Sequence, residues 1–439
     1  MKRLGDEHGS EGPPTRTTIL KTILRRISEH PLARVGPGLI TGVADDDPSG
    51  IATYSQAGAQ FGLNMLWTLP LTYPLMAAVQ SMCARLGRVT GRGLAANIKA
   101  NFPPWVLFGV VSLLLVANTL NIAADVAAMG ESAELVSGWN RHGLTLLFAA
   151  VTLGLQIFVP YHRYVFFLKW LTLALLSYAA VLFTVHVPWG QVLARTLLPQ
   201  VKFDAATATV VIAIFGTTIS PYLFFWQASE EVEDMSADRP ALIADPTGAP
   251  KELRRIRWDT WSGMLYSNLT AYFIVLATAV TLHSQGVVDI QTAGQAASAL
   301  RPLAGDFAFF LFAMGILGVG LIGIPVLAGS SAYALAEAMG WKWGLERKAQ
   351  DARGFYAVIA AGVLIGVGLE YAPINPMKAL FWSAVINGVV AVPLVVIVIL
   401  LSRRPAVMGR FTASSSLTVL GWITAGLMGA ATIGMLTFS

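Results

Sequence analysis

Length, composition and charge place this chain in a membrane. Of its 439 residues, 55% are apolar and 13% are charged, which is about half the charged fraction of soluble globular proteins. A single soluble core is therefore excluded. The one cysteine, Cys83, also excludes a secreted disulfide framework.

Eleven apolar stretches are long enough for membrane helices, each of which needs about 20 mostly apolar residues. An all-α polytopic membrane protein is therefore predicted. In chain order the predicted spans are 35–62, 64–84, 104–130, 143–160, 165–187, 205–229, 259–283, 306–339, 354–371, 376–401 and 415–437.

The basic residues predict the orientation of these spans. If the N-terminus is cytoplasmic, 25 of the 30 Lys and Arg residues fall in cytoplasmic segments, as the positive-inside rule requires. The predicted protein is therefore a multi-pass protein of the inner (plasma) membrane with its C-terminus outside. The excess of Lys and Arg in cytoplasmic segments also explains the net charge of +5, so the charge does not indicate a nucleic-acid partner.

This topology predicts three parts of the chain. Residues 1–34 form a cytoplasmic tail. Residues 35–401 form a ten-helix transport core with halves 35–187 and 205–401. Residues 402–439 form a cytoplasmic turn and the eleventh helix.

Two of the spans are predicted to be broken near their middle. The first contains the run Asp47-Pro48-Ser49-Gly50, and the sixth contains Ser220-Pro221. Proline removes a backbone donor and clashes with the preceding helical turn. The first and sixth spans are five helices apart, so two five-helix halves would have opposite orientations. Paired breaks of this kind indicate inverted repeats with a binding site at the bilayer midplane.

The residues around the breaks offer only oxygen ligands. Ionisable side chains at membrane depth are costly and usually functional. Unwound backbone also frees carbonyl groups, and oxygen ligands suit Mg²⁺, Ca²⁺ and Mn²⁺. The candidate ligands are the side chains of Asp45, Asp46, Asp47, Ser49 and Ser220, with carbonyls near Ala44 and Thr217.

The chain resembles the Nramp divalent-metal transporters in two segments. One runs from Gly36-Pro37-Gly38 through Asp47-Pro48-Ser49-Gly50 to Ala57-Gly58-Ala59-Gln60-Phe61-Gly62, and the other is Gly216-Thr217-Thr218-Ile219-Ser220-Pro221-Tyr222. The resemblance implies a LeuT-type fold of two inverted five-helix repeats plus an eleventh helix. It also implies a divalent metal held between the broken helices 1 and 6.

Departures from the family pattern bear on the choice of metal. Gly50 stands where the family has Asn, and Ser220 stands where the family has the Met that favours softer metals. The pattern is therefore similar to the divergent Nramp-related magnesium transporters. Asp125 matches an acidic position of the family's proton route, whereas Gln227 occupies a position that is usually His.

These observations predict a secondary transporter of magnesium or manganese that works by alternating access with weak or no proton coupling. One alternative is a proton-coupled manganese and iron importer of the standard Nramp type. The other is a cation-coupled symporter of a small organic solute. No enzymatic activity, cofactor, nucleic acid or obligatory protein partner is expected. The expected partners are the transported cation and the lipid bilayer.

Overall fold

The computed structural model describes residues 41–42, 44–159, 168, 171–200, 202, 204–235, 239–370 and 375–438. The predicted tail 1–34 lies outside these residues. The described residues contain helices and no β-strand. The α-helices are α3 (Pro48–Phe61), α4 (Thr68–Thr90), α5 (Leu94–Asn101), α6 (Pro104–Ser137), α7 (Arg141–Phe158), α9 (Leu176–Val181), α10 (Trp189–Leu197), α11 (Ala205–Thr218), α12 (Pro221–Glu233), α13 (Ala249–Thr281), α14 (Ala293–Ala297), α15 (Arg301–Ala304), α16 (Ala308–Met339), α17 (Arg353–Glu370), α18 (Pro376–Arg403), α19 (Pro405–Met408) and α20 (Ser415–Phe438).

Short 3-10 helices connect several of these elements. They are η1 (Gly62–Met65), η2 (Leu171–Leu175), η3 (His283–Gln285), η4 (Ser298–Leu300), η5 (Gly305–Phe307) and η6 (Gly409–Phe411). The sequence did not predict α5, α10 or α14 as helices of their own. They lie between the predicted spans and are too short to cross a membrane.

Seven helical stretches in the described part of the chain are long and apolar enough to cross a membrane. Two further apolar helices, Leu171–Val181 and Arg353–Leu369, are shorter. The predicted span 64–84 corresponds to α4, which has 23 residues. The predicted span 165–187 is only partly described. The prediction of an all-helical, multi-pass membrane protein is confirmed.

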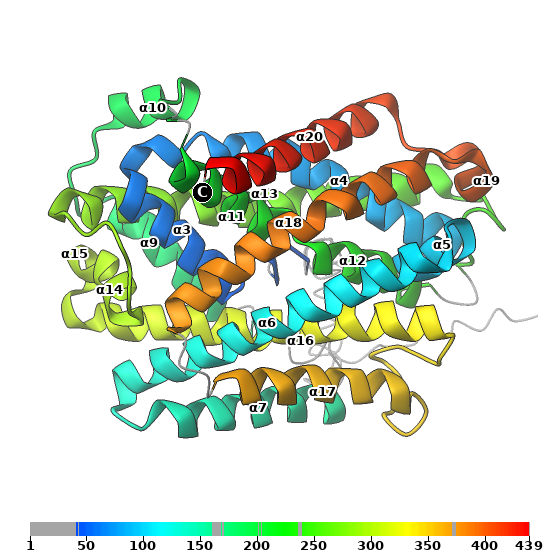
Figure 1. Ribbon diagram of the computed structural model, residues 1–439, viewed down its shortest axis with the longest axis horizontal. Coiled ribbons are helices and arrows are strands. Elements are labelled where there is room, and N and C mark those ends of the chain that lie inside the picture. The colour runs from blue at the N-terminus through cyan, green and yellow to red at the C-terminus, as the bar shows by residue number, and fades with distance from the viewer. Residues whose placement is uncertain are drawn as a thin grey trace, which may run out of the picture. The chain divides into compact units, whose positions relative to one another are not determined.

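The helices pack into two neighbouring groups around α6. Figure 1 shows α6 beside α16, with α7 and α17 along the same side, and contacts join all four helices. On the other side, α18 contacts α3, α6 and α11, and α20 covers α11 and α18. The helices that contain or adjoin the two breaks are therefore enclosed by other helices.

Close backbone contact between α11 and α18 depends on glycine. A Cβ atom added to Gly216 would lie 2.0 Å from the carbonyl oxygen of Ala384 and 2.4 Å from the amide nitrogen of Gly388. Membrane helices associate largely through such packing of small residues. A methyl group at this position would force the two backbones apart.

We therefore expect Gly216→Ala to reduce strongly the yield of monodisperse protein and to lower its melting temperature by several degrees. The matched control is Gly109→Ala in α6, because a Cβ atom there meets nothing within 4 Å. Size-exclusion chromatography and a thermal-unfolding scan in detergent would compare the two variants. Equal behaviour of both would show that the α11–α18 contact tolerates separation.

Candidate metal centre

Both predicted breaks are present, each directly before a proline. The chain is helical at Ala44 and Asp45, bends at Asp46 and is extended at Asp47, where φ is −69° and ψ is 172°. Likewise α11 ends at Thr218, and Ser220 is extended with φ −77° and ψ 132°. Proline disfavours helical conformation in the residue before it, and it suits the first position of a new helix. Each second helix therefore begins at its proline.

The Asp47 carboxylate caps the N-terminus of α3. Its Oδ1 accepts hydrogen bonds from the Gly50 amide at 2.8 Å and from Ser49 Oγ at 2.6 Å. Its Oδ2 accepts a hydrogen bond from Asn121 Nδ2 at 2.8 Å. A negative charge is favourable at this end of a helix. Asp47 is only 1% exposed, so its carboxyl group is held in place inside the protein.

Two buried asparagines connect Asp47 to α6 and α18. Asn121 Nδ2 lies 3.2 Å from Asp125 Oδ2 as well as contacting Asp47. Asn387 Nδ2 donates to Asn121 Oδ1 at 3.5 Å. The sequence analysis singled out Asp125 but missed both asparagines. The sequence feature that could have identified them is a polar amide side chain within an otherwise apolar span.

The carboxylates of Asp45 and Asp46 face α13 rather than Asn121. Ser267 Oγ lies 2.5 Å from Asp45 Oδ2 and 2.9 Å from Asp46 Oδ1. In the described part of the chain, no three His, Cys, Asp or Glu side chains are grouped so that they could hold one metal ion. The three aspartates therefore do not face one point in this conformation, and their role as metal ligands stays a prediction. The helical turn before the bend directs Asp45 and Asp46 away from Asp47.

Hydroxyl groups donate hydrogen bonds to the backbone carbonyls that the sequence analysis named as candidate ligands. Tyr222 donates from its hydroxyl to the Ala44 carbonyl at 3.2 Å. Ser220 Oγ lies 2.8 Å from the carbonyl oxygens of both Gly216 and Thr217. A carbonyl oxygen has two lone pairs, and a hydroxyl that donates keeps its own lone pairs. These groups therefore remain able to bind a cation.

The two breaks touch at Gly50. A Cβ atom on Gly50 would lie 2.9 Å from Thr217 Oγ1 and 3.6 Å from the Asp45 carbonyl oxygen. Gly323 of α16 closes another side, because a Cβ atom there would lie 3.1 Å from Asp47 Cβ. Small residues thus allow α3, α11 and α16 to surround Asp47.

Gln227 forms no hydrogen bond with Asp47 or with the residues that surround it. It lies seven residues beyond Ser220 in α12, or roughly 10 Å along the helix. It is fully buried, and its side-chain oxygen and nitrogen have no hydrogen-bond partner among the described residues. The structure therefore separates Gln227 from the Asp47 group.

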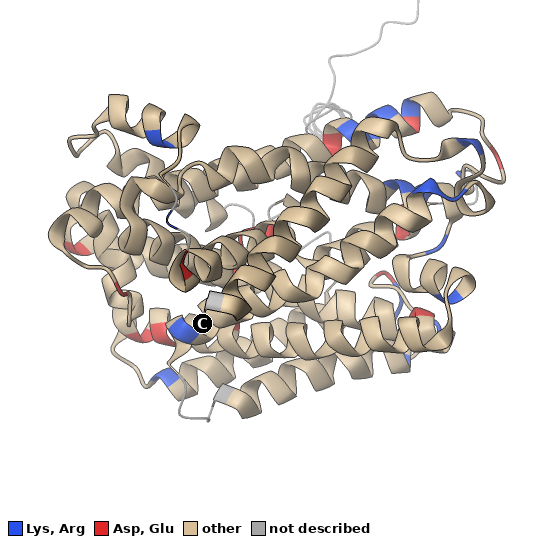
Figure 2. Cartoon of the chain, turned by 45° about the horizontal axis from the view of Figure 1, so that its top comes forward, with Lys and Arg blue, Asp and Glu red and all other residues tan. Residues whose placement is uncertain are grey.

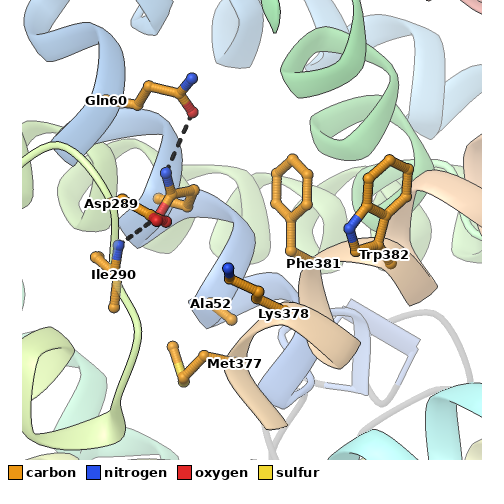
Figure 3. A pocket seen from close by; sticks show the side chains of 9 residues that line it. Ala52, Gln60, Asp289, Ile290, Met377, Lys378, Phe381 and Trp382 are labelled. Atoms are coloured by element: carbon orange, nitrogen blue, oxygen red, sulfur yellow. Dashed lines mark hydrogen bonds between the residues drawn. The ribbon is translucent and has the colours of Figure 1, made fainter. Parts of the chain in front are cut away.

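A cavity of about 240 Å³ lies near the centre, along α3. Figure 3 shows Lys378, Phe381 and Trp382 on one side of the cavity and Gln60 and Asp289 on the other. Ala52 also lines it, and Ala52 lies five residues beyond Asp47, roughly 8 Å along the helix. The aspartates themselves are 0–1% exposed, so this conformation is occluded at the centre.

Gln56 lines the cavity next to the loop that precedes α14. Its Nε2 donates to the Val288 carbonyl at 3.1 Å, and its Oε1 accepts from the Ile290 amide at 2.9 Å. Gln56 Nε2 also donates to Gln60 Oε1 at 3.1 Å. The loop before α14 is thus attached directly to α3.

The model of the family described as "Natural resistance-associated macrophage protein-like", or Nramp, matches residues 38–438. The chain belongs to the Nramp family. The match covers both breaks and all the helices described above. The Nramp chain is therefore a membrane transporter rather than an enzyme, as the sequence predicted.

Two curated relatives carry the name divalent metal cation transporter MntH. The protein from Acidiphilium cryptum is 28% identical over 395 residues, which are 87% of this chain and 84% of the relative. The protein from Bradyrhizobium diazoefficiens is 28% identical over 412 residues, which are 90% of this chain and 87% of the relative.

Solved structures show which fold this Nramp chain has. The manganese transporter of Eremococcus coleocola has a TM-score of 0.72 and 17% identity, with 98% of this chain and 90% of that chain covered. MhsT in complex with L-phenylalanine has a TM-score of 0.58 and 13% identity, with 91% and 98% covered. Mhp1, a nucleobase-cation-symport-1 family transporter, has a TM-score of 0.53 and 13% identity, with 92% of each chain covered. The predicted LeuT-type fold is confirmed.

Proposed function

We propose that this Nramp protein carries divalent metal cations across the membrane by alternating access, and that manganese is its cargo. The observation that carries the proposal is the Asp47 carboxylate, held between the two helix breaks by Ser49, Gly50 and Asn121. Carboxylate, hydroxyl and carbonyl oxygens surround it, and such ligands suit hard divalent ions.

The relatives favour manganese over the magnesium branch that the sequence pattern suggested. The curated relatives are named as divalent metal cation transporters, and the structural relative from Eremococcus coleocola is named as a manganese transporter. Nothing in these comparisons supports a magnesium-transporting branch. We therefore propose the cargo of the standard Nramp type. Weak proton coupling stays a prediction from the sequence.

MhsT and Mhp1 are similar to this chain only in fold, so they do not support the alternative of an organic solute. Asp45, Asp46, Asp47 and Asp125 all line the centre, and no ion pair reaches them among the described residues. Four buried carboxylates repel an anionic solute and attract a cation. The charge of the centre therefore favours a metal ion.

Uptake into proteoliposomes tests the proposal. Mn²⁺, Mg²⁺ and Ca²⁺ entry would be measured in parallel, with a pH dye inside the vesicles. We expect Mn²⁺ to enter faster than Mg²⁺ and much faster than in protein-free liposomes. Absence of flux for every divalent ion would refute the proposal, and acidification that follows Mn²⁺ entry would refute weak proton coupling.

Ser220 is the residue at which we expect metal selectivity to change. Ser220→Met would place a thioether beside the carbonyls of Gly216 and Thr217, and sulfur prefers softer metals. We expect Cd²⁺ to compete with Mn²⁺ roughly tenfold better, which corresponds to about 1.4 kcal/mol. Competition of Cd²⁺ against Mn²⁺ uptake would measure this, with Ser262→Met on the exposed face of α13 as the control. We leave Gly50 unchanged, because any side chain there would meet Thr217.

We also propose that the chain lies in the inner (plasma) membrane with its N-terminus inside and its C-terminus outside. Figure 2 shows Lys and Arg gathered toward one end of the helices. Several Lys and Arg side chains donate to backbone carbonyls of other segments: Arg85 to that of Phe411, Arg404 to that of Asn101 and Lys99 to that of Ala338. Basic segments of this kind stay on the cytoplasmic side. The predicted parts 1–34, 35–401 and 402–439 follow from the same topology.

Reporter fusions test this orientation. A reporter fused after Arg404 should be cytoplasmic, and one fused after Ser439 should be on the outer side, because α20 lies between them. Alkaline phosphatase activity and fluorescent-protein emission distinguish the two sides. If both fusions reported the same side, α20 would not span the membrane.

A further inference from the structure

The pair of carboxylates on the α13 side of the break has fewer hydrogen-bond donors than acceptor oxygens. Ser267 Oγ lies within hydrogen-bond distance of Asp45 Oδ2 at 2.5 Å and of Asp46 Oδ1 at 2.9 Å. A serine hydroxyl has one hydrogen and can satisfy only one of these oxygens at a time. When both carboxylates are ionised, the other contact brings two oxygen atoms together without a shared hydrogen. A positively charged ligand among the three oxygens would stabilise this arrangement.

Further oxygens around the pair also lack partners. Asp45 Oδ1 and Asp46 Oδ2 are buried and have no hydrogen-bond partner among the described residues. The Tyr54 hydroxyl and Thr217 Oγ1, on residues that are 0% and 2% exposed, interact with each other and have no other hydrogen-bond partner among the described residues. Both residues lie near Asp45, because a Cβ atom on Gly50 would be 2.9 Å from Thr217 Oγ1, 3.4 Å from Tyr54 Cε2 and 3.6 Å from the Asp45 carbonyl oxygen. Buried polar groups are costly unless they are paired, so this set of oxygens indicates an absent ligand.

Asp47 differs from its two neighbours in this respect. Both of its carboxylate oxygens already accept hydrogen bonds, from Ser49 and Gly50 on one side and from Asn121 on the other. The unpartnered carboxylate oxygens therefore belong to Asp45 and Asp46 and not to Asp47. The two groups of ligands face different helices, α13 and α6.

The charge at the centre agrees with two ions. Asp45, Asp46, Asp47 and Asp125 are each 0–1% exposed, and no ion pair among the described residues neutralises them. Together they carry four negative charges when ionised. Two divalent cations carry the matching charge, and neighbouring metal ions that share a protein site are well known.

We propose that Asp45, Asp46 and Ser267 form a second position for a hard divalent cation, separate from the position at Asp47. The hydroxyls of Tyr54 and Thr217 complete its oxygen ligands. This inference rests on the proposed function, because the cation is taken to be the same as the transported one. An all-oxygen set of this kind suits Mn²⁺ or Mg²⁺.

The number of Mn²⁺ ions bound per chain tests the inference. Purified protein in lipid nanodiscs would be titrated with Mn²⁺, and the free ion would be counted by electron paramagnetic resonance. We expect the unmodified protein to bind two ions. The double variant Asp45→Asn/Asp46→Asn should bind one, and Asp47→Asn should also bind one. Asp204→Asn, a helix-capping aspartate outside the centre, should still bind two.

Ser267→Ala supplies a milder variant in case the double variant does not fold. It keeps both carboxylates, and we expect the affinity for one of the two ions to fall at least tenfold. Unchanged affinities would overturn the second position. A single ion in the unmodified protein would overturn it too, whether Asp47→Asn alone removes that ion or all three aspartates are required. In that case the proposed transport of manganese would stand, whereas absence of both binding and uptake would refute the proposed function itself.

Discussion

Asp47→Asn should reduce Mn²⁺ uptake to the level of protein-free liposomes while the protein remains folded. Asparagine is as good an N-cap as aspartate, and its side-chain oxygen can still accept the hydrogen bond that the Gly50 amide donates at 2.8 Å. The substitution therefore keeps the start of α3, removes the negative charge and replaces the oxygen that accepts from Asn121 with an NH2 group. A neutral amide oxygen binds a divalent ion more weakly than a carboxylate, because affinity depends on the charge of the ligands.

The control for this experiment is the same substitution at another helix N-terminus. Asp204 caps α11 by accepting a hydrogen bond from the Thr207 amide at 2.8 Å, and it is exposed. Asp204→Asn should leave uptake close to that of the unmodified protein. Both variants should give the same elution volume in size-exclusion chromatography. Full uptake by Asp47→Asn would remove Asp47 from the metal centre.

The breaks in the helices could be predicted because their cause is local. Pro48 and Pro221 each follow a residue that proline keeps out of the helical conformation, and the structure begins α3 and α12 at these positions. The spacing of these breaks predicted inverted repeats, and the LeuT-type fold followed from the resemblance to Nramp. Neither prediction required knowing which side chains contact each other.

The partners of the aspartates could not be predicted, because they come from distant parts of the chain. Asn121 lies 74 residues from Asp47, and Ser267 lies 222 residues from Asp45. An asparagine in an apolar span indicates a polar contact, but the sequence does not say with which residue. The direction of the bend at Asp46, which separates Asp45 and Asp46 from Asp47, likewise depends on packing against α13.

Asn121 is the residue that the structure adds to the centre, and we expect Asn121→Ala to weaken the apparent affinity for Mn²⁺ by about 10- to 100-fold. Groups that hold a metal ligand in place typically contribute this much, and Asn121 Nδ2 donates to Asp47 Oδ2 at 2.8 Å.

The matched control for Asn121→Ala is one turn away on the same helix. Asn118 is also fully buried, but its amide donates to the Leu327 carbonyl and to Ser330 and Ser331 of α16. Asn118→Ala should lower the melting temperature without changing the Mn²⁺ concentration at half-maximal uptake. Asn121→Ala should change that concentration instead, because its loss frees the Asp47 carboxylate to move. If both variants changed stability alone, Asn121 would be a packing residue, and Asp47 would be held by α3 without help from α6.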